Sequence, residues 1–235
     1  RVKDGSLLKD EIHNRVISVY WLADNSGFIY SRLSDVKNPY SREIKLHYLG
    51  DSPEDDRLIY AQYKEGPLAT TWGPFASLSE DGRWLLLSYY TGTRSNDLWL
   101  IDFKEWVEFG EFKKREIICD CDSMTHARVV GGRLFIHSNE GAPNGQIYES
   151  ELANPCRKNW QIIIKERVDA TIEGWDFSKN ALIVSYQKSA ISELIKFDLQ
   201  SLTPSEIKLP GIGSASISCS EGHDNFFIRY ESFNH

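Results

Sequence analysis

The residues of this chain that could do acid–base or nucleophilic chemistry stand apart from one another. A serine hydrolase raises its nucleophile on a sharp turn of the form G-x-S-x-G and adds a histidine base with an orienting carboxylate. The 235-residue sequence contains no G-x-S-x-G, and its histidines occur singly in expected strands or turns. We therefore predict no catalytic residue in this chain. The six histidines are His13, His47, His126, His137, His223 and His235.

Metal, cofactor and redox motifs are also missing from the sequence. The four cysteines form no C-x-x-C pair, and we interpret them as buried or half-buried reduced thiols. The carboxylate run Glu54–Asp56 lacks the alternate-position spacing of a calcium loop, so a solvated turn is expected. Gly211–Ser216 begins like a dinucleotide-binding loop but lacks its last glycine and following helix. We expect no metal and no cofactor. The cysteines are Cys119, Cys121, Cys156 and Cys219.

Composition narrows the class of protein further. The net charge is −7 and the sequence pI is about 5.4, which argues against a nucleic-acid partner because such a protein needs a basic face. No run of about 18 apolar residues occurs, so no membrane span is expected. The first residues, from Arg1 to Ser6, include no initiator methionine and no apolar signal stretch. We expect a cytoplasmic location and a chain taken from the interior of a longer protein.

The elements that must position these residues repeat along the chain. Five times an apolar strand enters a tight turn and returns as a second apolar strand, with turns about 45 to 55 residues apart. Glycine, asparagine and aspartate at such turns tolerate positive φ. A repeat of this length with several strands per unit is typical of a β-propeller. The turn residues are Gly27, Gly82, Gly132, Asn180 and Asn225.

The fold prediction is therefore all-β, a partial β-propeller of about five antiparallel blades, the first four with four strands each. The second strand of each unit is the most apolar, as in Trp84–Leu87, which is expected of a strand covered on both faces. The tryptophans Trp72, Trp84, Trp99, Trp160 and Trp175 are expected mainly in the core between blades. Residues 103–114 show weak helical periodicity, and a loop or short turn is expected there. The units cover approximately residues 10–65, 70–122, 125–167, 170–210 and 213–235, and the last is only half a blade.

Four segments in order along the chain resemble the propeller of the prolyl oligopeptidase (prolyl endopeptidase) family. Leu78–Ser88 is similar to the family's "S-x-D-G-R-Y-L" strand pair, and Gly92–Trp99 to the loop after it. The resemblance implies the last five of seven blades, followed in the family by an α/β-hydrolase domain that this chain lacks. The other segments are Asp10–Tyr30, Lys45–Tyr60 and Ser138–Glu166.

The resemblance also implies which loops contact a peptide. Trp72 and Gly73 align where animal enzymes carry a Trp-Met pair, and Thr93 with Arg94 aligns with a peptide-contacting loop in which many relatives have cysteine at the position of Thr93. These four residues are the substrate-lining candidates. The segment Leu33–Arg42 corresponds to a longer mobile loop near the family's domain interface. Its charged residues Asp35, Lys37 and Arg42 are the gating candidates.

The implied function is that of a non-catalytic cap. It would admit short peptides to a hydrolase domain that cleaves after proline, and it would exclude folded proteins. Two alternatives remain open: a stand-alone binding propeller, since propellers host many functions, and the cap of an enzyme like oligopeptidase B or acylaminoacyl peptidase. Expected partners are the hydrolase domain and short peptides. The isolated chain, with unpaired sheet edges, is expected to stay an open arc or to pair with a second copy.

Overall fold

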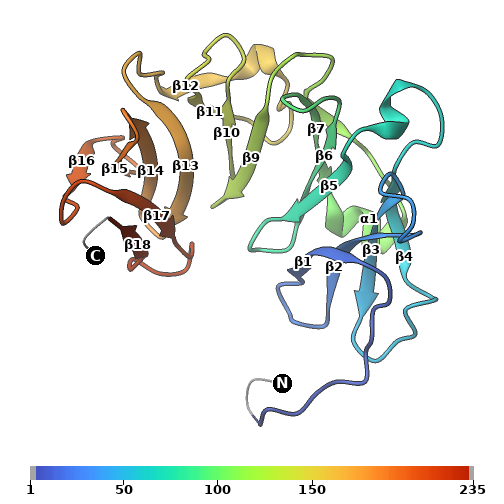
Figure 1. The fold of residues 1–235 in the computed structure, drawn as a ribbon. Coiled ribbons are helices and arrows are strands. Elements are labelled where there is room, and N and C mark those ends of the chain that lie inside the picture. The colour runs from blue at the N-terminus through green and yellow to red at the C-terminus, as the bar shows by residue number, and fades with distance from the viewer. Residues whose placement is uncertain (1–3, 233–235) are drawn as a thin grey trace. The chain divides into compact units, whose positions relative to one another are not determined.

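The chain is an all-β protein, as predicted. The structure is a computed structural model that describes residues 4–232. Within that range there are eighteen β-strands, one α-helix and two 3-10 helices (Figure 1). The strands form four four-stranded sheets and one two-stranded sheet. The chain divides into two compact units: unit 1 runs to Thr125 and takes in residues 154–157, and unit 2 comprises residues 126–153 and the chain from Lys158 on.

The first sheet of unit 1 is an antiparallel meander with the order β1-β2-β3-β4. At its first hairpin, the Asp24 carboxylate accepts a 2.9 Å hydrogen bond from the Ser26 amide, and Asn25 takes a left-handed φ of 57°. Asparagine and aspartate favour such turns because they form local hydrogen bonds and tolerate positive φ, so the predicted turn is present. The strands are β1 (Val16–Trp21), β2 (Gly27–Leu33), β3 (Arg42–Tyr48) and β4 (Arg57–Ala61).

The second sheet of unit 1 has the order β5-β6-β7-β8. Its second strand buries four consecutive residues, Trp84–Leu87, which confirms the expectation of a strand covered on both faces. A short 3-10 helix, η1 (Pro67–Thr70), connects the two sheets and begins with proline, whose fixed φ suits a helical first turn. The strands are β5 (Gly73–Leu78), β6 (Trp84–Tyr90), β7 (Asn96–Asp102) and β8 (Arg115–Ile118).

Helix α1 (Phe103–Phe109) corrects the expectation of a loop at residues 103–114. Asp102 caps it by accepting a hydrogen bond from the Glu105 amide, and Gly110 ends it with φ of 73°. Seven residues are too few for helical periodicity to stand out in sequence, and the caps compensate by satisfying the free backbone groups at the two ends. Phe103 and Trp106 are buried against the sheets of unit 1.

Unit 2 contains two further four-stranded sheets and the two-stranded sheet. The half blade expected at the end of the chain is the pair β17-β18. The 3-10 helix η2 (Arg157–Asn159) lies before β12. The strands are β9 (Thr125–Val130), β10 (Arg133–Ser138), β11 (Gln146–Ser150), β12 (Gln161–Ile164), β13 (Thr171–Ser178), β14 (Ala181–Lys188), β15 (Ile191–Asp198), β16 (Pro204–Ile207), β17 (Ser214–Ser218) and β18 (Phe227–Glu231).

Each unit has its own hydrophobic core. In unit 1 the core joins residues of β2 to β7 and α1, including Ile29, Leu87 and Ile101. In unit 2 it joins residues of β9 to β14, including Phe135 and Val184. Burial of such side chains contributes about 1.5 to 3 kcal/mol each, so the packed faces of the sheets carry most of the stability.

The first and last strands leave apolar side chains in solvent. Val16, Val19 and Trp21 on β1 are exposed, as is Phe227 on β18. Open strands of this kind can pair with another chain, and pairing between copies stays a prediction. Among the described residues, no helix has the length and apolarity needed to cross a bilayer.

Candidate functional site

Two neighbouring cavities in unit 1 bring together sequence-predicted residues that lie far apart in the chain. The first, called here the aromatic cavity, is about 690 Å³ in volume. The second, called the loop cavity, is about 700 Å³ and lies beside residues 34–43. Tyr40, Arg42 and Thr70 line both of them. The main walls of the aromatic cavity are Arg15, Tyr40, Arg42, Thr71, Trp72 and Phe75.

Arg42 is a buried cation that has no carboxylate partner in the described part of the chain. It begins β3, is 7% exposed, and its guanidinium carbon lies 3.8 Å from the centre of the Phe75 ring. Among residues 4–232, no atom accepts a hydrogen bond from its Nε or Nη1. Burial lowers the pKa of Arg42, and the neighbouring Arg15 lowers it further. A buried guanidinium in this state is under-satisfied, since burying a charge is costly unless it is paired.

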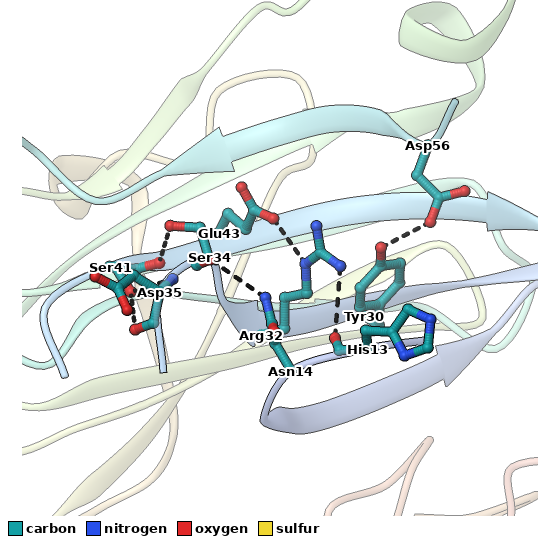
Figure 2. A network of polar contacts seen from close by, with 9 residues as sticks. All are labelled: His13, Asn14, Tyr30, Arg32, Ser34, Asp35, Ser41, Glu43 and Asp56. Atoms are coloured by element: carbon teal, nitrogen blue, oxygen red, sulfur yellow. Dashed lines mark hydrogen bonds and ion pairs between the residues drawn. The ribbon is translucent and has the colours of Figure 1, made fainter. Parts of the chain in front are cut away.

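The acidic groups beside Arg42 are engaged elsewhere. Glu43 follows it on β3 but faces Arg32 across the strand pair, at 2.8 Å between its Oε1 and the Arg32 Nε (Figure 2). Asp35 accepts a hydrogen bond from the Lys37 amide at 2.9 Å. Successive side chains on a strand point to opposite faces, so the carboxylate nearest in sequence to Arg42 lies on the other side of the sheet.

The predicted gating segment Leu33–Arg42 includes the last residue of β2 and the first of β3, and the loop between them, residues 34–41, is held by its own hydrogen bonds. The Ser34 amide donates to the Ser41 carbonyl at 2.9 Å, and the Ser41 hydroxyl lies within 3.0 Å of the Asp35 amide. Figure 2 shows this closed ring of contacts beside Asn14, whose amide reaches the Ser34 carbonyl. Of the gating candidates, Asp35 and Arg42 line the loop cavity, whereas the exposed Lys37 lines neither cavity.

Trp72 is exposed to solvent and follows a turn that is held by side-chain hydrogen bonds. It is 63% exposed, which corrects the expectation of a core tryptophan, and it lines the aromatic cavity. The buried Gln62 side chain donates to the carbonyls of Ala69 and Thr71, at 3.2 and 2.8 Å, and so fixes the turn that precedes Trp72. Of the other tryptophans, Trp84 and Trp99 are buried and Trp160 and Trp175 are partly buried.

Gly73 has a structural reason to be glycine. Its φ is +74°, and a Cβ at this position would lie 2.2 Å from the Gln62 side-chain oxygen. A methionine or any other side chain here would displace Gln62 and loosen the turn that it holds. This explains why the chain departs from the Trp-Met pair that the resemblance implied.

Thr93 and Arg94 lie away from both cavities. They are exposed at the tip of the hairpin between β6 and β7, and the ends of this hairpin are tied by the Thr91 amide donating to the Ser95 carbonyl at 3.1 Å. Neither residue lines the aromatic or the loop cavity. Of the four substrate-lining candidates, only Trp72 lines the aromatic cavity; Gly73 is buried directly behind it.

The sequence interpretation missed a buried polar network in the first sheet. The His47 imidazole is 0% exposed and lies between two carboxylates, with Nδ1 2.7 Å from Asp56 and Nε2 3.1 Å from Asp10. Asp56 also accepts a 2.6 Å hydrogen bond from the Tyr30 hydroxyl (Figure 2). Asp56, with its side chain 2% exposed, is therefore not the solvated turn residue that was expected. The acid-rich turn just after His47 was the available signal.

This network is structural in character. Both ring nitrogens of His47 lie within hydrogen-bond distance of carboxylate oxygens, so both polar atoms of the ring are used in holding Asp10 and Asp56. The ring is buried away from solvent, and its hydrogen-bond partners in the described part of the chain are the carboxylates of Asp56 and Asp10. Backbone and imidazole hydrogen bonds lower the pKa of Asp10, from the Gly50 amide first and His47 second. The network thus ties residue 10 to β3 and to the turn after it.

Among the described residues, the other histidines and the cysteines belong to no group of three or more potential metal ligands. His13 and His223 are exposed, and His235 lies outside the described residues. His126 and His137 stack in unit 2 with ring centres 6.5 Å apart, and burial lowers the pKa of His137 to about 4. All four cysteines are partly buried and none is in a disulfide among the described residues, and burial raises the pKa of Cys119 and of Cys219 to about 12.

Comparison with known proteins places this fold. Residues 1–235 match the family model described as prolyl oligopeptidase, N-terminal β-propeller domain. The chain is 28% identical over 210 residues to a prolyl endopeptidase of Elizabethkingia miricola, covering 84% of this chain and 27% of that protein. It is 26% identical over 242 residues to one of Dictyostelium discoideum, covering 92% and 31%.

Solved structures agree with the family match. A prolyl endopeptidase structure superimposes with a TM-score of 0.83 at 26% identity, covering 93% of this chain and 32% of that one. The apo structure of prolyl oligopeptidase B from Galerina marginata has the same fold, with a TM-score of 0.81 at 20% identity and coverage of 99% and 33%. The chain therefore spans about a third of the length of the relatives it matches, and the predicted partial propeller is confirmed.

Proposed function

Because this chain belongs to the prolyl oligopeptidase N-terminal β-propeller domain family, we propose that it is the non-catalytic cap of a serine peptidase that cleaves short peptides after proline. The observation that carries the proposal is the family match over the whole chain, together with the superposition on a prolyl endopeptidase. The catalytic serine, base and acid would lie in an α/β-hydrolase domain outside this sequence, which contains no G-x-S-x-G.

The cap would act by exclusion and by gating. A propeller over an active site keeps out bulk water and folded chains, and loop or domain motion then admits a short peptide. Inter-domain dynamics have a role in the catalysis and specificity of the solved prolyl endopeptidases. The loop at residues 34–41 lines a cavity next to Trp72 and supports a gating role, because one segment borders both the loop cavity and the aromatic cavity. Trp72 would contact the peptide, with Thr93 and Arg94 as further candidates.

The test uses the intact protein, a serine-reactive phosphonate probe and a short blocked peptide containing Gly-Pro. Labelling together with cleavage after proline is the expected result. Labelling with cleavage after arginine or lysine would instead assign the chain to an enzyme like oligopeptidase B. The absence of labelling would contradict the peptidase proposal and leave a binding propeller.

The gating proposal has a separate test. Deleting residues 34–40 in the intact protein should change the turnover of a Gly-Pro peptide while phosphonate labelling of the serine persists. Unchanged turnover of both a short and a long peptide would contradict a gating role for this loop. The proposed location is the cytoplasm, where thiols stay reduced, and cell fractionation tests it.

A further inference from the structure

The unpaired guanidinium of Arg42 is the feature of this molecule that most needs an explanation. Nearly all buried charges in proteins are paired, because an uncompensated one is strongly destabilising. Within residues 4–232, however, the Nε and Nη1 of Arg42 have no hydrogen-bond partner, and its guanidinium carbon lies 3.8 Å from the centre of the Phe75 ring. Cation–π contact satisfies the face of the guanidinium and leaves its N–H edge to seek an acceptor.

The charged and titratable groups around Arg42 do not supply an acceptor for its Nε and Nη1 hydrogens among the described residues. Arg15, the other ionic group in the wall of the aromatic cavity, is also a cation. The Tyr90 phenol lies close enough to interact with Arg42, but burial raises its pKa and keeps it neutral. On the loop side, Glu43 is paired with Arg32 and Asp35 accepts from the backbone of its own loop. The wall of the aromatic cavity therefore carries two positive charges and no carboxylate.

The shape and lining of the cavity suit a small amphiphilic ligand. Its volume of about 690 Å³ falls within the range of pockets that hold small molecules. The exposed aromatic rings of Trp72 and Tyr40 border it, and Val16, Ile17 and Leu33 add apolar surface. An inorganic anion would use the cations but leave this apolar wall in water. A short peptide that bears a carboxylate would use both.

We propose that the aromatic cavity is a binding site for the carboxylate of a peptide, with Arg42 as its main ligand-binding residue. The carboxylate would accept charge-assisted hydrogen bonds from the guanidinium, whose fork matches a carboxylate geometrically. Arg15 would add long-range attraction, and a side chain of the peptide would pack on Trp72. The site would select acidic peptides or peptides with a free C-terminus. This inference rests on the proposed function only for the nature of the ligand, a peptide.

The experiment measures binding and not cleavage. Calorimetry on the intact protein compares N-acetyl-Ala-Phe, its C-terminal amide, and N-acetyl-Asp-Phe-amide. These peptides lack proline, so binding can succeed or fail independently of cleavage after proline. We expect at least one acid to bind about tenfold or more tightly than the neutral amide, as one charged hydrogen-bonded contact implies. Preference for the first peptide assigns a C-terminal carboxylate, and preference for the third assigns an acidic side chain.

Variants connect this preference to Arg42. In Arg42→Gln the ratio of acid to amide affinity should fall below about twofold, and in Arg42→Lys it should be intermediate because the bidentate geometry is lost. Lys165→Gln removes the same charge from an exposed residue that lines neither cavity, and it should leave the ratio unchanged. Thermal melts check folding, and if Arg42→Gln does not fold, the Arg42→Lys result decides. Equal binding of acid and amide by the wild type, an unchanged ratio in a folded Arg42 variant, or binding of inorganic phosphate alone would overturn the proposal.

Discussion

Each unit of this protein contains an arginine and a histidine in a polar interior, and the two units treat them in opposite ways. In unit 1, His47 lies between Asp10 and Asp56, whereas Arg42 has no carboxylate. In unit 2, Arg128 reaches both Asp176 and Glu221, the latter at 3.1 Å, and its side chain is 32% exposed. His137, with His126 beside it, has no carboxylate in contact among the described residues.

The comparison distinguishes buried titratable side chains that have a carboxylate partner from those that have none. A cation held by two carboxylates has its charge and its hydrogen bonds satisfied, and such a cluster joins segments of chain. A buried histidine that has no carboxylate partner avoids the cost of a buried charge by staying neutral, because the pKa of histidine lies close to neutral pH. Arginine cannot do so, because it keeps its proton in proteins. An arginine without an acid beside a cavity therefore points to an external anion.

The largest effect is expected at His47. His47→Leu would remove the ring that contacts both Asp10 and Asp56, and removing one partner of a buried charged contact costs about 3 to 5 kcal/mol. Urea unfolding should show a loss of about 3 kcal/mol or more. His13→Leu, at an exposed histidine, is the matched control and should change stability by less than about 0.5 kcal/mol. Equal losses in the two variants would show that the network is not stabilising.

The second largest effect is expected at Arg128, the arginine that has two carboxylate partners. Arg128→Met would remove the partner shared by Asp176 and Glu221, and the free energy of unfolding should fall by about 2 kcal/mol, because the cluster is only partly buried. Arg229→Met is the control, since Arg229 and its partner Glu231 are both exposed and such pairs contribute little. A loss at Arg128 no larger than that at Arg229 would contradict the role assigned to the cluster.

We expect the stability of the fold to depend on pH because of His137, which is buried without a carboxylate partner among the described residues. Burial, with a smaller effect from His126, lowers the pKa of His137 to about 4, below its ordinary value of 6.5. Between these values the unfolded chain binds a proton that the folded chain does not, so stability is complete above pH 6.5 and falls as the pH drops toward 4. The loss should be about 2 kcal/mol after partial exposure is taken into account. His137→Gln should flatten this slope in urea unfolding between pH 7.5 and 4.5, and an unchanged slope would assign it to other groups.

The smallest effect on the free energy of unfolding is expected at Arg42, and it has the opposite sign. Without a ligand, Arg42→Met removes an unpaired buried charge and keeps an apolar chain of similar length against Phe75. The free energy of unfolding should stay the same or rise by up to about 1 kcal/mol. Chemical unfolding of this variant beside Arg128→Met measures the comparison directly. A loss at Arg42 as large as that at Arg128 would mean that Arg42 is already satisfied within the fold.

Local sequence signals were sufficient for most of the fold. Asn25 and Gly82 in the tight turns have positive φ, as glycine and asparagine at hairpins indicate, and the strands on either side fall within the predicted repeat units. Helix α1 was missed although Asp102 and Gly110 are good cap residues, because a seven-residue helix has too little periodicity to be recognised. The family resemblance could also be recognised from the sequence, because the four similar segments occur in the same order as in the family.

The sequence by itself determined the strands, the turns and the family, because turn chemistry and the alternation of apolar residues act between near neighbours. Only the tertiary structure decided which charges meet. Asp10 finds His47 across 37 residues of chain, and Glu43 turns away from its neighbour Arg42 to pair with Arg32. Trp72, which the tryptophan pattern favoured in the core and the family resemblance placed among the peptide-contacting residues, is exposed and lines the same cavity as Arg42. Such pairings depend on strand register and on where distant segments of chain return to the sheet, and the spacing of residues along one strand does not encode either.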